Sequence, residues 1–259
     1  MKLASLLDQY RELREERLQN ETKRKRAAAG LLIVGLQQRL LSSIEAFART
    51  LKVHRKTVQR QWEKMQHETE SKPEELKAVT LDLLTGVVDN DDDRAVLDED
   101  QLQAEEDAQV EAVSAATMGP VKDMSAQQLF TRELKLLQEM SDIAEDARGK
   151  PDARILKLLD WIRQKMCPDL GKSGVKWNRT RVLIFTEYED TKRYLIQQLQ
   201  SALAGSDDAD RRIEVFHGPT PPQKRDEIKR AFNAEPSKHP VRILVATAVS
   251  YTHLRAHET

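Results

Sequence analysis

Residues 181–247 constrain the fold of this chain most, because short apolar runs alternate there with segments of helical periodicity. The runs are rich in β-branched and aromatic residues and are too short for buried helices, so three strands are predicted, at 181–187, 213–218 and 241–247. Strands that alternate with helices form right-handed crossovers. We therefore expect an α/β domain with a buried parallel sheet.

Two amphipathic helices are predicted between these strands. The first has Asp190 as a suitable N-cap and turns four residues to one face: Tyr194, Leu195, Leu199 and Ala202. The second starts at Pro221 and Pro222, since proline is favoured in the first turn of a helix. Its apolar side consists of Ile228, Ala231 and Phe232.

The functional edge of such a sheet can be located before any function is assigned. Ligands of open parallel sheets bind beyond the carboxyl ends of the strands. Five residues are predicted at those ends: Thr186, Glu187, His217, Gly218 and Thr247.

Three pieces of this run resemble the second motor domain of superfamily-2 helicases. They are LIFTEYEDT, FHG followed by Arg225 and Phe232, and ILVAT, and they match motif IV, the H-G…R…F segment and the start of motif V. The nearest likeness is to the Swi/Snf-type, RapA-like branch of DNA translocases. The resemblance covers about a quarter of the chain and implies an incomplete RecA-like second helicase lobe at 179–247.

The resemblance implies a fragment of an ATP-dependent DNA helicase or translocase. Its lobe would bind the nucleic-acid backbone with little sequence preference and in a salt-sensitive manner. The residues implied in this contact are Thr186, His217, Gly218, Arg225 and Thr247. A turn histidine and an exposed helical arginine remain the structural alternatives for His217 and Arg225. The implied partners are DNA and the missing N-terminal RecA-like lobe, with ATP and Mg²⁺ between the two lobes of the intact enzyme.

The sequence also departs from the family pattern. Ala248 stands where an Asp is expected, and no arginine-finger motif, DExH box or GxxxxGK[ST] loop is present. Gly171 and Lys172 do not begin a P-loop, because Met166 occupies the position of its first glycine. We therefore assign no catalytic residue, expect no bound cofactor for this chain alone, and predict no ATPase activity. Residues 248–259 are interpreted as a non-native tail.

The rest of the chain is predicted to be mostly helical. Residues 1–88 are assigned to a helical region between the motor lobes, 89–123 to a disordered acidic linker, and 124–178 to a helical lead-in. The basic run at 23–26 could contact phosphate or act as a nuclear address, although such a run is usually a solvated helix face.

Residues 47–62 offer an alternative function, a non-enzymatic DNA-binding regulator. This segment resembles a helix-turn-helix, in which the second helix enters the major groove. Lys52 lies near the expected turn, where the usual glycine is missing, and the helical stripe continues through it. A packed helix with a basic outer face therefore remains open. So does a third function, a helical interaction protein in which the α/β part is only a scaffold.

Composition excludes several other classes. The single cysteine, Cys167, excludes an internal disulfide framework and a cysteine-based zinc module. His253 and His257 have a spacing suited to a metal, but no third ligand is evident. The acidic segment lacks EF-hand spacing. No apolar stretch approaches the roughly 18 residues of a membrane span, and a cytoplasmic location is expected.

Overall fold

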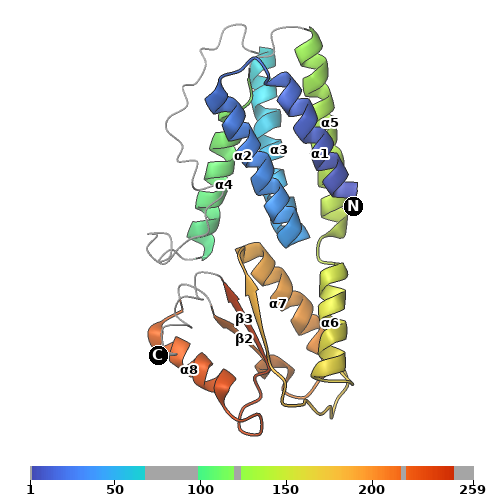
Figure 1. Ribbon diagram of the computed structural model, residues 1–259, viewed down its shortest axis with the longest axis vertical. Helices are drawn as coiled ribbons and strands as arrows, with labels where there is room; N and C mark the ends of the chain where they lie inside the picture. The colour runs from blue at the N-terminus through green and yellow to red at the C-terminus, as the bar shows by residue number, and fades with distance from the viewer. Residues whose placement is uncertain (1, 68–98, 120–123, 217–219, 248–259) are drawn as a thin grey trace. The chain divides into compact units, whose positions relative to one another are not determined.

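The computed structural model describes residues 2–67, 99–119, 124–216 and 220–247 (Figure 1). These residues divide into two compact units, a helical unit that ends at Arg148 and an α/β unit that begins at Gly149. The predicted helical lead-in at 124–178 is therefore split, with one helix in each unit. Among the described helices, none has both the length and the apolarity needed to cross a membrane.

The helical unit contains five helices within the described residues. They are α1 (Lys2–Arg17), α2 (Lys23–Ser42), α3 (Ile44–His67), α4 (Glu99–Ala116) and α5 (Met124–Ala147). Four of them (α1, α2, α3 and α5) share one core, because each carries apolar residues every three or four positions. Phe47 and Leu51 of α3 are fully buried in this core. Trp62 stacks on Phe130 of α5, with ring centroids 4.5 Å apart.

Ser43 interrupts the apolar stripe that the sequence carries from α2 into α3. Its backbone is extended, and its Oγ accepts a hydrogen bond of 3.1 Å from the backbone N–H of Ala46. This is the N-cap geometry that satisfies an otherwise unpaired N–H at a helix start. Residues 39–43 are thus the end of α2 and a helix boundary.

The prediction of a disordered linker at 89–123 is wrong for residues 99–116, which form α4. Val110 and Val113 lie one helical turn apart and are buried against Ala28 and Leu32 of α2. The remaining parts of that linker, 89–98 and 120–123, lie outside the described residues.

The acidic side chains of α4 meet basic side chains of α2 and α3. Arg49 lies 2.9 Å from a carboxylate oxygen of Asp107, and Arg39 lies 3.5 Å from one of Glu106. The acidic segment is therefore helical because tertiary partners neutralise it, which the local composition does not reveal.

Of the two interpretations left open for residues 47–62, the structure has the packed helix and not the helix-turn-helix. Residues Ile44–His67 are a single uninterrupted helix, α3, so the turn that would set a second helix at an angle is absent. Two arginines that such a motif would use are engaged inside the unit: Arg60 forms an ion pair with Glu111, and Arg55 donates to Gln138.

A chain of buried hydrogen bonds connects α1, α3 and α4. Arg14 Nη1 donates a hydrogen bond to Tyr10 Oη (2.6 Å). The Tyr10 hydroxyl can therefore use its own proton to donate a hydrogen bond to His54 Nε2 (2.7 Å). His54 then carries its proton on Nδ1 and donates to Ser114 Oγ (2.7 Å), which donates to the Val110 carbonyl (2.5 Å). Every link has one donor and one acceptor, as buried polar groups require.

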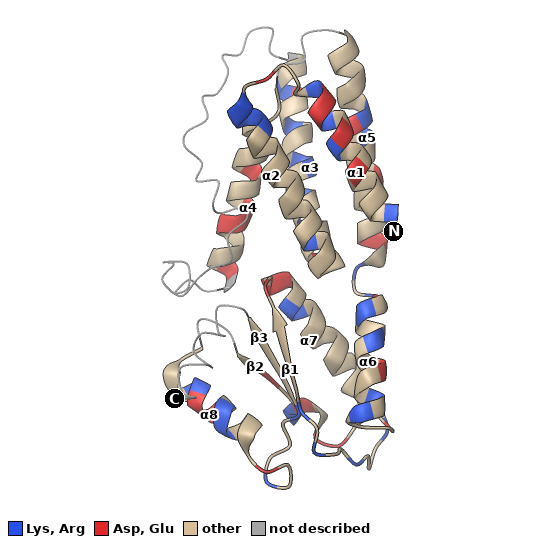
Figure 2. Ribbon diagram, viewed as in Figure 1, with Lys and Arg blue, Asp and Glu red and all other residues tan. Residues whose placement is uncertain are grey.

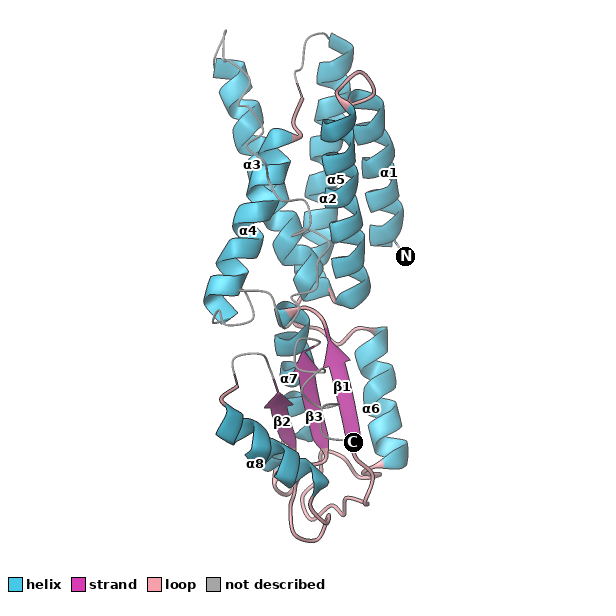
Figure 3. Cartoon of the chain, turned by 60° about the vertical axis from the view of Figure 1, so that its left-hand side comes forward, coloured by secondary structure: helices cyan, strands magenta, loops and turns pink. Residues whose placement is uncertain are grey.

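The α/β unit is built on a parallel sheet of three strands, as expected from the sequence. The strands are β1 (Val182–Thr186), β2 (Ile213–Phe216) and β3 (Ile243–Thr247), in the order β1-β3-β2. Their arrows point to the same end of the unit (Figure 3). All residues of the central strand, β3, are buried, which explains its continuous apolar sequence.

Helices cover both faces of this sheet. One face packs on α6 (Ala153–Lys165) and α7 (Glu189–Leu203) through Ile243 and Val245. The other packs on α8 (Pro222–Asn233) through Leu244 and Ala246. This division follows from the two-residue period of a strand. Asp190 is not the N-cap of α7: Tyr188 holds that position without a side-chain hydrogen bond, and Asp190 lies in the first turn.

Candidate functional site

Thr186 and Thr247 lie side by side at the carboxyl ends of neighbouring strands. They are register partners in β1 and β3, so their Cα atoms are about 4.8 Å apart, the spacing of adjacent strands. In each strand, the residue two positions before the threonine faces α6 and α7, so the threonine side chain is on the same face. Both threonines are 8% exposed. Thr186 Oγ1 lies 3.5 Å from the Tyr188 carbonyl. These two hydroxyl groups therefore belong to the α7 side of the sheet.

Arg225 is held at the end of β2, on the opposite side of the sheet. Its Nε donates to the Thr220 carbonyl (2.7 Å), and its guanidinium carbon lies 5.7 Å from the ring centroid of Phe216. Phe216 is the last residue of β2 and packs in the cluster that faces α8. The structure thus brings the predicted residues to one edge of the sheet but divides them between its two faces. His217 and Gly218 lie outside the described residues.

The two helices that start at this edge differ in charge. Glu189 and Asp190 occupy the first turn of α7, and Glu189 pairs with Lys192 at 2.8 Å (Figure 2). The first turn of α8 has no acidic residue and carries Lys224 and Arg225. Acidic residues already complement the dipole of α7, so an approaching anion is favoured on the α8 side.

Lys192 is a residue at this edge that sequence analysis missed. Its side chain is only 3% exposed, although lysine is rarely buried, and the carboxylate of Glu189 neutralises it. The only signal in the sequence is the Glu189–Lys192 spacing of three residues, which is also common on solvated helices.

Three arginines at the opposite edge of the sheet, Arg181, Arg212 and Arg242, stabilise loops. Arg242 alone donates to four backbone carbonyls, those of Asn178, Pro236, His239 and Val241. Burial lowers the pKa of both Arg212 and Arg242. These side chains therefore hold the loops at the amino-terminal ends of the strands in place.

Other residues considered from the sequence are occupied structurally. Gly171 N–H donates to Ser206 Oγ (3.0 Å) and Lys172 pairs with Asp169 at 2.8 Å, so neither is arranged to hold a phosphate. Burial raises the pKa of the Cys167 thiol, which disfavours the nucleophilic thiolate. Within the described ranges, no group of three or more His, Cys, Asp or Glu side chains could hold a metal ion.

Compared with protein-family models, with curated proteins and with solved structures, the chain matches none.

Proposed function

We propose that this chain is part of an ATP-dependent DNA helicase or translocase, in which the α/β unit contacts the nucleic-acid backbone at the carboxyl edge of its sheet. The observation that supports this most is that Thr186, Thr247 and Arg225 lie at the same edge of the sheet, the two threonines on its α7 side and Arg225 on its α8 side. These residues come from the three segments whose sequence resembles helicase motifs.

The chemistry of these residues suits a backbone rather than a base. A threonine hydroxyl can donate to one phosphate oxygen, and a guanidinium can bind a phosphate with two parallel hydrogen bonds. Contacts of this kind position a strand without reading its sequence. Arg225 is fixed by Thr220 and Phe216, so little side-chain freedom would be lost on binding.

The loop at Gly171 and Lys172 and the first turn of α7 are not arranged to hold the phosphates of ATP. The Gly171 N–H donates to Ser206 Oγ, Lys172 pairs with Asp169, and α7 presents carboxylates. ATP and Mg²⁺ therefore remain part of the proposal only for an enzyme that also has the other motor lobe.

A binding titration with the whole chain tests the proposal. Fluorescence anisotropy is measured for two labelled duplexes of unrelated sequence, at several salt concentrations. We expect similar affinities for both duplexes, and a fall in affinity with rising salt. Arg225→Gln should weaken binding by about tenfold and reduce the salt slope by roughly one.

Arg230→Gln is the matched control, because Arg230 is an exposed arginine in the last turn of the same helix. It should change the affinity by less than about twofold. Equal losses in the two variants would indicate a general charge effect and contradict the proposed edge. Absence of binding at low salt would favour the helical interaction protein, with the α/β unit as scaffold.

A further inference from the structure

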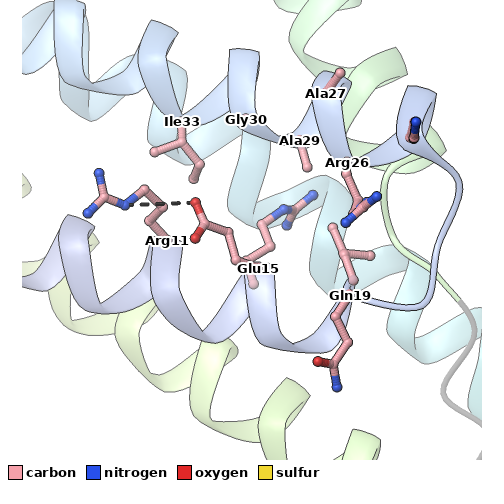
Figure 4. Close-up of a pocket in the computed structure, with 11 residues that line it drawn as sticks. Arg11, Glu15, Gln19, Arg26, Ala27, Ala29, Gly30 and Ile33 are labelled. Carbon is pink, nitrogen blue, oxygen red and sulfur yellow. Dashed lines mark ion pairs between the residues drawn. The ribbon is translucent and has the colours of Figure 1, made fainter.

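A cavity of about 520 Å³ lies between α1 and α2 of the helical unit (Figure 4). Its volume is in the range of sites for small organic ligands. The residues that line it belong to two helix faces and the turn between them, and they include Leu18, Lys23, Arg26, Ala29, Gly30 and Ile33.

The α2 side of the cavity changes character along the helix. Lys23, Arg26, Gly30 and Ile33 follow one another at intervals of three or four residues and therefore share one face. Arg26 and Ile33 both point from α2 toward α1 (Figure 4). Lys23 and Arg26 are exposed, whereas Ile33 is buried. This face is cationic at its start and apolar about 15 Å further on.

The cationic end has no acidic partner in the part of the chain that the structure describes. Within the described residues, neither Lys23 nor Arg26 has an ion pair, whereas neighbouring Lys25 pairs with Glu21 at 3.4 Å. The first turn of α2 contains no acidic residue. Cations at the start of a helix oppose its dipole, so this arrangement is unfavourable unless an anion completes it.

The remaining walls define the kind of ligand. Leu18, Ala29 and Ile33 are buried and form an apolar floor. At the far end, Arg11 and Glu15 form an ion pair of 4.0 Å, and both residues line the cavity. Arg14 also lines it, and its Nε is buried without a hydrogen-bond partner in the described structure. An unsatisfied buried donor is uncommon.

We propose that this cavity binds a small amphipathic anion, with a phosphate or carboxylate group between Lys23 and Arg26 and an apolar body against Leu18, Ala29 and Ile33. The site is independent of the nucleic-acid edge. Two residues of the basic run at 23–26 then have a role in binding, Lys23 and Arg26, because only these two line the cavity.

Gly30 provides a direct way to close the site. A Cβ built on Gly30 meets no atom within 4 Å, so a larger side chain has space there. Glycine inside a helix is also less favourable than residues with a side chain. Gly30→Leu should therefore keep or raise the melting temperature while filling the cavity.

The test uses 1-naphthyl phosphate as a fluorescent probe of the whole chain. Saturable binding is expected, with 1-naphthol and inorganic phosphate each at least about tenfold weaker, because each lacks one half of the ligand. Gly30→Leu should weaken probe binding by about tenfold or more. Lys23→Gln and Arg26→Gln should each weaken it by about tenfold, the usual effect of a lost charge-assisted hydrogen bond.

Arg24→Gln is the matched control, because Arg24 is exposed in the same turn but does not line the cavity. It should leave the affinity within about twofold. The proposal is overturned if the probe does not bind saturably, if Arg24→Gln weakens binding as much as Arg26→Gln, or if a folded Gly30→Leu variant binds the probe normally.

Discussion

His54 is fully buried in the helical unit, with one ring nitrogen paired to Tyr10 and the other to Ser114. Burial lowers its pKa well below the usual 6.5, and the positive charge of Arg14 lowers it further. Tyr10 is affected in the opposite direction: burial raises its pKa from 10.0 to about 12. Both groups are therefore held neutral, the state in which their hydrogen bonds are complete.

The neutral state of His54 gives a prediction for pH dependence. Because its pKa is lower in the folded than in the unfolded chain, the unfolded chain binds a proton first as the pH falls below 6.5. The free energy of unfolding should then decrease by up to about 1.4 kcal/mol for each pH unit below 6.5. Urea denaturation between pH 7 and pH 5 measures this slope.

His54→Gln is the reference for that measurement, because the carboxylates that also titrate in acid are the same in both proteins. The variant should be less stable at pH 7, and the part of the slope due to His54 should disappear. An identical pH dependence in both proteins would show that His54 is not buried in its neutral form.

At the level of single residues, Thr186 and Thr247 could be placed at one sheet edge from the sequence, because strand ends are visible in local patterns. Arg225 could be singled out only through the resemblance to helicase motifs. The strand period also determines which face each residue occupies, although that step needs the register of β1 against β3. The burial of Lys192 and His54 could not be predicted, since it depends on packing between distant segments.

At the level of elements, α3 and α4 show how tertiary contacts decide between local alternatives. Residues 47–62 carry both a helix-turn-helix likeness and a continuous apolar stripe, and the stripe determines the structure. Acidic composition favours disorder for α4, but Val110 and Val113 bury against α2 and basic side chains pair with the acids. For both helices, the residues that make these contacts lie far away in the sequence.

The continuity of α3 can be measured at Lys52, which is exposed in the middle of that helix. Lys52→Gly should lower the free energy of unfolding by roughly 0.7–1 kcal/mol relative to Lys52→Ala, because glycine is a poor residue inside a helix. Denaturant midpoints of the two variants make the comparison. Equal or greater stability of the glycine variant would indicate a turn at this position.

At the level of the whole molecule, the sequence predicted an α/β part with a parallel sheet after a largely helical part, and both are present. It did not predict that the boundary lies between Arg148 and Gly149. That boundary separates α5 from α6, two helices with similar amphipathic patterns. The unit that each one joins is decided by which core its apolar face enters, and periodicity alone does not specify this.

Mapping the nucleic-acid contact tests the central proposal most directly. Amide chemical shifts of the isotope-labelled chain are recorded by NMR while a short DNA duplex is added at low salt. We predict that the largest changes occur at Thr186, Thr247 and Arg225, at the carboxyl edge of the sheet. If they instead gather around Arg212 and Arg242 at the opposite edge, or in the helical unit, the proposed interface is contradicted.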